Sequence, residues 1–396
     1  MNNSIQAVTI LGSTGSIGIN TLKVLSMHSS DYRVYALTAH TSADALFEQC
    51  LVFNPAVAVI ASEKDAGHLE SRLREAGLET QVLWGEEGLV EVASAKQTDI
   101  VMAAIVGGAG LVPTLAATRA GKKVLLANKE ALVMAGELFM QAAIDNGAPI
   151  LPIDSEHNAI FQCLPVNSLG RFNDHHEAGV AKLLLTASGG PFRDLPLQSL
   201  ASVTPQQACA HPNWVMGRKI SVDSASMVNK ALELIEASYL FGLQADRIDI
   251  LLHPQSIVHS LVSYRDGSVL AQLGNPDMRT PIAYGLAWPE RIDAGVPALD
   301  LIATGKLEFH QPDHRRFPAL PLGREVATAR GAAPIIFNAA NEVAVAGFLN
   351  GQVGFTQIPV IIDRVLQDLD LPAPGDLESI LQTDREARAM AGKYLV

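Results

Sequence analysis

The chain has 396 residues, of which 48% are hydrophobic and 18% are charged, and its formal net charge is −12. A chain of this length can bury the cores of two or three domains. The negative balance argues against nucleic acid or an anionic membrane as the main partner, because both are bound through basic surfaces. A phosphorylated substrate stays compatible with it, since local charge can oppose the net charge.

The cysteines and the N-terminal sequence favour a reducing compartment. Cys50, Cys163 and Cys209 are widely spaced and odd in number, unlike a disulfide framework. The first residues, MNNSIQAVTILGS, lack the basic segment and long apolar run of a secretory signal. No apolar run reaches the length of about eighteen residues that a membrane span needs. We therefore expect a cytoplasmic protein.

Short apolar segments alternate with segments of helical length over the first part of the chain. The apolar segments are residues 7–11, 33–37, 56–60, 99–106 and 122–128. Between them, helices are expected at 17–27, 42–51, 64–76 and 111–120. Continuous apolar strands that alternate with helices predict a parallel sheet covered on both faces. We expect a doubly wound, Rossmann-like α/β domain over residues 1–153.

A glycine-rich loop, ILGSTGSIG at residues 10–18, follows the first expected strand and opens the first helix. Its glycines permit a tight turn and a close approach of the backbone to a diphosphate. The N–H groups of Thr14, Gly15, Ser16 and Ile17 would then face an anion at a helix N-terminus. An ordinary strand-to-helix turn is the alternative. The position in the first βαβ unit favours a dinucleotide.

The end of the second strand predicts which dinucleotide is bound. An NAD enzyme usually has an acid there for the ribose 2′-hydroxyl. This chain has His40, Thr41 and Ser42 and no acid before Asp44. Hydroxyl groups and a histidine suit a 2′-phosphate better than a carboxylate does, although the site has no arginine. The sequence therefore predicts NADPH.

Polar residues also follow the strand at 122–128, where ligands of parallel sheets gather. They are Asn128, Lys129 and Glu130. They can contact a ligand, or Asn128 can simply cap the next helix.

The pattern changes after residue 153. Strands are expected at 182–186, 248–252, 256–264 and 268–273, and Arg265-Asp266-Gly267 predicts a hairpin between the last two. We expect a central α+β catalytic domain with an antiparallel sheet over 154–287. A proline-containing linker follows at 288–318, and a C-terminal helical bundle at 319–396.

Two carboxylates, Asp154 and Glu156, lie between apolar segments in LPIDSEHNAIF. In extended backbone the side chains of residues i and i+2 share one face. Like charges so placed repel each other unless a cation joins them, and Mg²⁺ or Mn²⁺ is the natural ion for oxygen ligands. The alternative is that each acid pairs with its own lysine or arginine. For the neighbouring His157 we expect a structural role.

A third carboxylate is offered by residues 220–240, which predict a helix starting near Ser224. Ser226, Asn229, Lys230 and Glu233 would share one side of this helix. Hydroxyl, amide and ammonium groups near a helix start can bind phosphate, and Glu233 could reach the metal ion. The alternative is a solvated polar face with Ser224 as N-cap.

Two further segments complete the candidate site. Ser188 precedes two glycines directly after a strand, which lets the chain wrap around an anion. Residues 208–220 carry His211, Trp214 and Met216 between turn residues, which predicts a lid over a bound ligand. An anchoring role in the core is the alternative for Trp214.

Together, LGSTGSIG, LLANKE, DSEHNAIFQ, SGGPFR, HPNWVMGRKISVDSASMVNKALE, HPQSIVHS and NPDMRTPIA closely resemble the 1-deoxy-D-xylulose 5-phosphate reductoisomerase family. The resemblance implies rearrangement and reduction of that sugar phosphate to 2-C-methyl-D-erythritol 4-phosphate, in non-mevalonate isoprenoid biosynthesis. It also implies a homodimer that uses NADPH and Mg²⁺, Mn²⁺ or Co²⁺.

The resemblance also implies roles for matching residues. The implied metal ligands are Asp154, Glu156 and Glu233, which with Lys129 and His211 form the implied catalytic set. The implied substrate contacts are Lys129, Ser155, Glu156, Ser188, His211, Ser224, Asn229, Lys230 and Glu233. The implied NADPH contacts are Thr14, Gly15, Ser16, Ile17, Asn128, Glu130 and Gly217.

One place departs from the family pattern. His40-Thr41-Ser42 stands where enterobacterial members have Gly-Lys-Asn, so a cation for the 2′-phosphate is missing or replaced by His40 and the hydroxyls. Three other functions share some of these features: an NADP-dependent dehydrogenase, a non-catalytic NADPH sensor, and a metal-dependent aldolase without a redox step.

Overall fold

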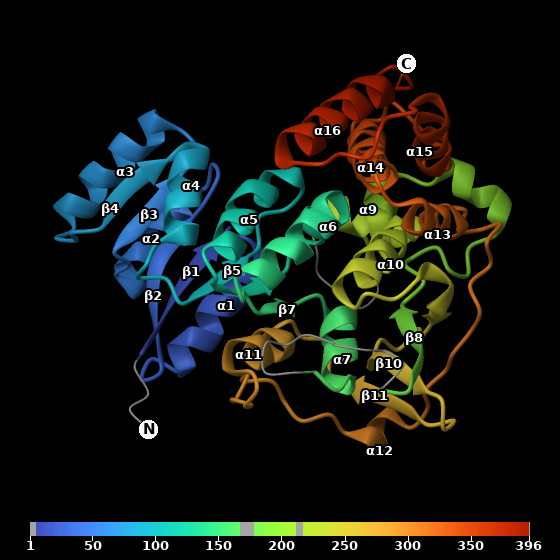
Figure 1. Ribbon diagram of the computed structural model, residues 1–396, viewed down its shortest axis with the longest axis horizontal. Helices are drawn as coiled ribbons and strands as arrows, with labels where there is room; N and C mark the ends of the chain where they lie inside the picture. Colours follow the sequence, from blue (N-terminus) through green and yellow to red (C-terminus); the bar gives the residue numbers. More distant parts are fainter. Residues whose placement is uncertain (1–4, 167–177, 211–216, 396) are drawn as a thin grey trace.

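The computed structural model describes residues 5–166, 178–210 and 217–395. The N-terminal part contains a seven-stranded sheet in the order β4-β3-β2-β1-β5-β6-β7, in which neighbouring strands are parallel (Figure 1). The strands are β1 (Gln6–Leu11), β2 (Tyr32–Thr38), β3 (Val57–Ile60), β4 (Gln81–Trp84), β5 (Ile100–Ala103), β6 (Lys123–Leu126) and β7 (Ile150–Pro152). The predicted Rossmann-like sheet is confirmed.

Both faces of this sheet are buried, which explains its continuous apolar strands. Alternate residues of β5 belong to different cores: Ile100 and Met102 pack on one face, and Val101 and Ala103 on the other. The surrounding helices are α1 (Ser16–Met27), α2 (Ala43–Phe53), α3 (Glu63–Glu75), α4 (Gly85–Ser94), the 3-10 turn η1 (Gly108–Gly110), α5 (Leu111–Arg119) and α6 (Lys129–Asp145). β4, α4 and β7 were not predicted, because β7 has only three residues and β4 and α4 are partly exposed.

The central part holds α7 (Ser155–Cys163) and a four-stranded sheet in the order β11-β10-β8-β9. Its strands are β8 (Val180–Ala187), β9 (Ile248–Leu252), β10 (Val258–Tyr264) and β11 (Val269–Leu273). β10 is antiparallel to both neighbours, but β8 and β9 are parallel. The prediction of a wholly antiparallel sheet was therefore wrong. The long helical connection between β8 and β9 permits the parallel pairing.

The helix expected from Ser224 consists of two helices. α9 (Arg218–Ser226) ends at Met227, whose φ of 61° is left-handed, and α10 (Val228–Leu240) follows. Ser224 thus lies in the last turn of α9 and caps nothing. α10 is buried on both sides because α6 and α13 (Ala319–Ala329) pack against it.

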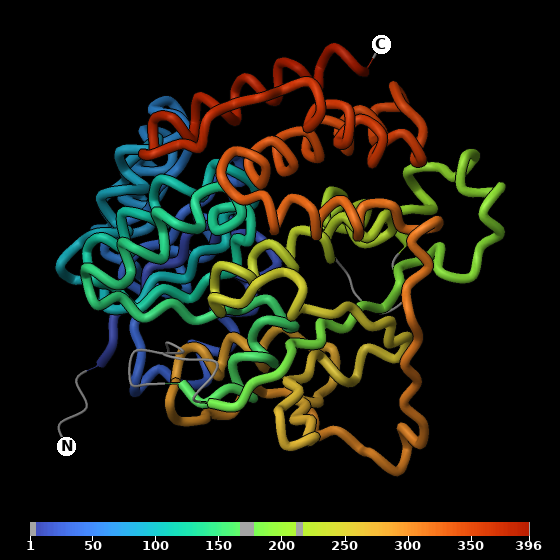
Figure 2. Tube along the Cα trace, turned by 45° about the vertical axis from the view of Figure 1, so that its right-hand side comes forward, coloured from blue at the N-terminus to red at the C-terminus, as the bar shows by residue number. Residues whose placement is uncertain are grey.

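The remaining chain supports this centre. Its elements are η2 (Leu197–Ser202), α8 (Pro205–Ala208), η3 (Ala245–Arg247), α11 (Arg279–Ala287), α12 (Leu301–Thr304), α14 (Ala333–Leu349), α15 (Gln357–Asp368) and α16 (Leu377–Gly392). Between α11 and α13 the chain runs as a largely irregular strap along one side of the molecule (Figure 2). The C-terminal helices α13 to α16 pack together, as predicted. The domain limits 153, 287 and 318 stay predictions.

Among the described residues, we found no helix with the length and apolar character needed to cross a membrane.

Candidate functional site

A cavity of about 460 Å³ lies at the carboxyl ends of the Rossmann strands. On one side it is lined by Gly15, Ser16 and Ile17 of the glycine loop. On the other side it is lined by predicted metal and substrate residues: Lys129, Asp154, Ser155, Glu156, Ser188, Ser224, Asn229, Lys230 and Glu233. Gly217 also contributes to its wall. One enclosure therefore joins the two halves of the predicted site.

The glycine loop has the tight geometry that its sequence predicts. Gly12 has a φ of +84°, and a Cβ atom there would lie 2.8 Å from the carbonyl oxygen of Ala104. Gly15 immediately precedes α1 in extended conformation. The first N–H groups of α1 have no partner within the helix, so this end can bind an anion. Thr14 belongs to the same turn but not to the lining of the cavity.

His40, Thr41 and Ser42 follow β2 and are exposed. Ser42 directly precedes α2, and its side chain does not cap that helix. The three residues do not line the cavity. Their contact with a 2′-phosphate stays a prediction.

Asn128 and Glu130 hold the walls of the cavity and do not line it. Asn128 caps α6 by accepting a hydrogen bond from the N–H of Ala131, and its amide donates to the carbonyl oxygen of Gly107 at 3.0 Å. Glu130 accepts a hydrogen bond from Lys219 at 2.8 Å. Burial alone would raise the pKa of Glu130, but the ammonium group of Lys219 outweighs it and lowers the pKa. The capping role that we set against ligand binding is thus present for Asn128.

The three predicted metal ligands converge from two helices. Asp154 is the residue before α7, Glu156 lies in the first turn of α7, and Glu233 lies on α10. One carboxylate oxygen from each lies within 4.8 Å of the others. The extended backbone expected at 154–156 was wrong, because α7 begins at Ser155. The carboxylates of Asp154 and Glu156 still lie close together, because both residues are at the N-terminal end of α7.

Two lysines bridge these carboxylates. The Nζ atom of Lys129 lies 2.5 Å from Asp154 and 3.3 Å from Glu233. The Nζ atom of Lys230 lies 2.7 Å from Glu156 and also pairs with Glu233. Burial alone would lower the pKa of Lys129, but Asp154 and Glu233 raise it well above its usual value. Burial and the neighbouring Glu156 raise the pKa of Glu233.

The composition of this cluster fits a hard divalent cation. Three carboxylates face two ammonium groups, so with all groups ionised one negative charge is in excess. Carboxylate oxygens are the ligands that Mg²⁺ and Mn²⁺ prefer. The lysine pairing and the metal site are therefore compatible, because the pairing alone does not neutralise the acids.

The predicted phosphate contacts lie beside this cluster. Asn229 accepts a hydrogen bond from Lys129 at 2.8 Å and donates to Glu233. Ser188 begins a loop in which Gly190, with a φ of +66°, packs against α9. A Cβ atom on Gly190 would lie 2.9 Å from the carbonyl oxygen of Ser224. The close packing at Gly190 thus allows Ser188 and Ser224 to line the same part of the cavity.

Several residues of the cavity wall have no role that the sequence predicts, among them Arg218, Lys219, His253 and His259. His259 is buried, and burial lowers its pKa although Glu156 opposes this effect. Both His253 and His259 belong to the motif HPQSIVHS, but its spacing alone does not indicate that both histidines face the cavity. His211, Trp214 and Met216 lie outside the described residues.

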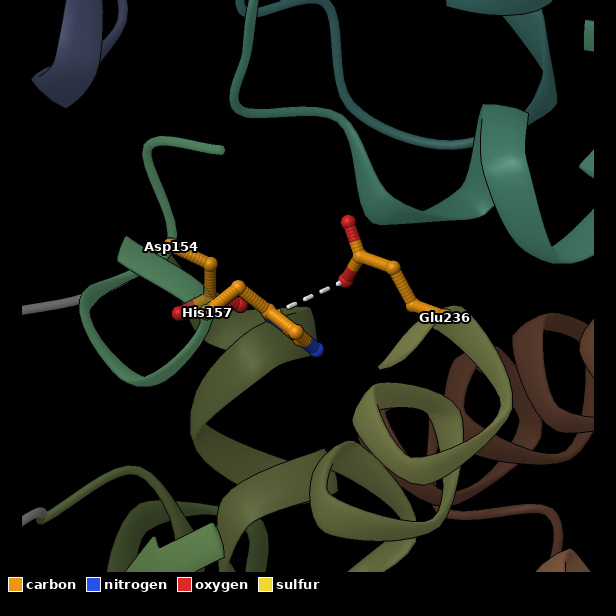
Figure 3. Close-up of side chains that lie close together, drawn as sticks. All are labelled: Asp154, His157 and Glu236. Atoms are coloured by element: carbon orange, nitrogen blue, oxygen red, sulfur yellow. Dashed lines mark ion pairs between the residues drawn. The ribbon is translucent and has the colours of Figure 1, made fainter. Parts of the chain in front are cut away.

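His157 and Glu236 form a buried pair close to Asp154 (Figure 3). The Nδ1 atom of His157 lies 3.4 Å from a carboxylate oxygen of Glu236. Its Nε2 atom lies 2.9 Å from the carbonyl oxygen of Glu233, so we assign a proton to Nε2. This contact connects α7 to the backbone of α10 directly at a predicted metal ligand. No pattern in the sequence indicates Glu236.

Three family models match the chain. The model of 1-deoxy-D-xylulose 5-phosphate reductoisomerase matches residues 8–136. The models of the two reductoisomerase C-terminal domains match residues 150–241 and 273–390.

Relatives of the same name extend over the whole chain. The 1-deoxy-D-xylulose 5-phosphate reductoisomerase of Cupriavidus pinatubonensis is 60% identical over 97% of this chain and 96% of its own. That of Cellvibrio japonicus is 57% identical over 98% of both chains.

Solved structures of reductoisomerases are also similar to this chain. A DOX-P reductoisomerase in complex with NADPH, fosmidomycin and magnesium is 47% identical, with a TM-score of 0.95 over 99% of this chain and 98% of its own. The Zymomonas mobilis reductoisomerase in complex with NADPH is 44% identical, with a TM-score of 0.91 over 100% of this chain and 99% of its own. This chain therefore belongs to the 1-deoxy-D-xylulose 5-phosphate reductoisomerase family.

Proposed function

We propose that this chain converts 1-deoxy-D-xylulose 5-phosphate into 2-C-methyl-D-erythritol 4-phosphate, with NADPH as the reductant and a divalent metal ion as cofactor. One observation carries the proposal: the glycine loop and the cluster of three carboxylates and two lysines line one cavity. A rearrangement followed by reduction requires the sugar and the reductant to meet in one enclosure. Family membership supplies the substrate, and NADPH and magnesium are bound in a related structure.

Asp154, Glu156 and Glu233 would hold the metal ion, for which their oxygens are suitably close. When bound, the ion acts as a Lewis acid toward the oxygens of the sugar. Lys129 and Lys230 pair with these buried carboxylates; burial alone would raise the pKa of Asp154, but the ammonium group of Lys129 lowers it. Asn229 orients Lys129 through a hydrogen bond of 2.8 Å. The positions of these charged groups are thus fixed before the substrate binds, so they can stabilise the charge that develops in the transition state.

Ser188, Ser224, Asn229 and Lys230 would bind the phosphate group. They come from the β8 loop, α9 and α10 and line the same cavity. The phosphate does not react, so its binding energy can orient the reacting carbon atoms. The start of α1 at Gly15, Ser16 and Ile17 would hold the diphosphate of NADPH.

The test is product identification in a stoichiometric reaction. The purified chain is incubated with the sugar phosphate, NADPH and Mg²⁺, and the products are analysed by NMR. The proposal predicts one 2-C-methyl-D-erythritol 4-phosphate for each NADPH oxidised. An aldolase would give cleavage fragments without NADPH oxidation, and an NADPH sensor would leave the sugar unchanged.

We also propose that the chain works in the cytoplasm as a homodimer. The free thiols of Cys50, Cys163 and Cys209 suit a reducing compartment. β11 is an outer strand of its sheet, and Val269 and Leu270 on it are about half exposed, which suits pairing with a second copy. Light scattering of the purified chain tests the dimer, and a monomeric mass at micromolar concentration would contradict it.

A further inference from the structure

One helix of the C-terminal bundle contacts two segments that contribute to the cavity, the loop after β5 and α9. Adjacent residues of α14, Asn341 and Glu342, point to different partners. The amide of Asn341 donates a hydrogen bond of 2.9 Å to Asp223 on α9. Glu342 lies against Gly107, in the loop after β5. α14 also packs against α6 and α9.

The loop after β5 is held from two sides. A Cβ atom on Gly107, which has a φ of +75°, would lie 3.1 Å from a carboxylate oxygen of Glu342. On the other side, the carbonyl oxygen of Gly107 accepts a hydrogen bond from Asn128. The preceding residues Ala104 and Val106 line the cavity. The side chain of Glu342 thus packs against a loop of which Ala104 and Val106 line the cavity.

Glu342 is itself fixed by α16. The guanidinium group of Arg388 donates to Glu342 at 2.6 Å, and its Nε atom donates to Asp384 at 2.7 Å. Arg388 also lies near the loop, since its Nη2 atom would be 3.9 Å from a Cβ atom on Gly108. The side chain of Glu342 is only 18% exposed. Desolvating a charge costs free energy, so removing Arg388 would leave the carboxylate of Glu342 poorly compensated.

The opposite wall contains Lys219, which lines the cavity. Its Nζ atom lies 2.8 Å from Glu130 and 2.9 Å from Asp223, the residue that Asn341 contacts. Burial alone would lower the pKa of Lys219, but Asp223, Glu130 and, more weakly, Glu342 raise it. The cation at this wall is therefore held by acids from α6 and α9, and α14 fixes one of those acids.

We propose that Glu342, held by Arg388, is a positioning residue for NADPH: it sets the place of the loop at residues 104–108 relative to α9. The C-terminal bundle thereby determines cofactor affinity without touching the cofactor. This inference rests on the proposed NADPH-dependent function. It concerns NADPH more than the sugar phosphate, because the loop lines the cavity next to the glycine loop.

The test measures NADPH affinity of the full chain by isothermal titration calorimetry. Glu342→Gln keeps the shape of the side chain and removes its charge, and Arg388→Ala removes the partner. We expect each to raise the Kd for NADPH about fivefold. Arg388→Lys should recover part of the loss. Arg385→Ala is the matched control, because Arg385 lies on the same helix and bonds to Gln382 within it.

At saturating NADPH, Glu342→Gln should leave the KM for the sugar phosphate at the wild-type value. Thermal unfolding shows whether a variant with weaker NADPH binding is still folded. If Arg388→Ala does not fold, the result for Glu342→Gln decides the test. A wild-type Kd for Glu342→Gln, in a chain whose wild type binds NADPH, would overturn the inference. A wild-type chain that does not bind NADPH would instead overturn the proposed function, and the inference with it.

Discussion

The Nζ atom of Lys230 lies 2.7 Å from the carboxylate of Glu156, and this ion pair joins α10 to α7 at the wall of the cavity. Lys230 also pairs with Glu233 on its own helix. The lysine thus holds together two acids that would repel each other. Lys230 therefore lies between two of the proposed metal ligands, and in the proposed function it also binds the phosphate group.

Replacing Lys230 by methionine keeps most of the apolar length and removes the charge. We expect the KM for the sugar phosphate to rise about tenfold, the effect of one charge-assisted hydrogen bond. Steady-state kinetics at saturating NADPH measures this. An unchanged KM in a folded variant would show that Lys230 serves only the carboxylates.

Glu233→Gln removes the carboxylate shared by both lysines. Metal-dependent turnover should fall about a hundredfold, because a ligand is lost and the remaining two acids are fully paired. Paramagnetic resonance of added Mn²⁺ should show weaker binding, while the Kd for NADPH stays at the wild-type value. Loss of NADPH affinity with intact Mn²⁺ binding would refute the assignment of Glu233 to the metal site.

Thr41→Arg tests where the 2′-phosphate of NADPH lies. If the phosphate lies beyond β2, the new cation should lower the KM for NADPH about fivefold, as expected for an exposed charge pair. The KM for NADH, which lacks the phosphate, should not change. Thr41→Gln provides the uncharged control. Equal effects of Thr41→Arg on both cofactors would place the phosphate elsewhere.

Lys123 gives a pH-dependent contribution to stability. Its ammonium group donates to the carbonyl oxygens of Leu286 and Trp288, and burial lowers its pKa from 10.5 to about 8. Between these two values the unfolded chain binds a proton that the folded chain has lost. The free energy of unfolding should therefore rise with pH across this window, because the unfolded chain binds up to about one proton more than the folded chain.

Lys123→Met removes this titration. Denaturant unfolding of both proteins from pH 8 to 10 should show a smaller pH slope for the variant. A constant difference between the two proteins reflects the lost hydrogen bonds, and only the difference in slope reports the titration. Parallel curves would mean that Lys123 keeps its ordinary pKa.

The fold class was predictable because it depends on local patterns. Buried parallel strands are continuous apolar runs, and the glycine loop marks the first turn. The parallel pairing of β8 with β9 was not predictable, because neither strand carries a signal for its partner. Nor was the break between α9 and α10, since Met227 adopts a left-handed conformation that its residue type does not favour.

The candidate site was predictable where its residues are close in sequence. Asp154 and Glu156 drew attention as charges among apolar residues, although the backbone that brings them together is a helix start. Their roles stay predictions. The network of Glu342 and Arg388 could not be predicted, because its contact with Gly107 joins residues more than two hundred positions apart. Such contacts leave no periodic pattern.

The central claim is that one cavity couples metal-dependent rearrangement to oxidation of NADPH. The most direct test follows the absorbance of NADPH after addition of 1-deoxy-D-xylulose 5-phosphate and Mg²⁺, and repeats it with a chelator and with NADH. We predict rapid decay with NADPH, no decay with the chelator, and slower decay with NADH. Decay that persists in the chelator, or no decay with a folded protein, would contradict the account.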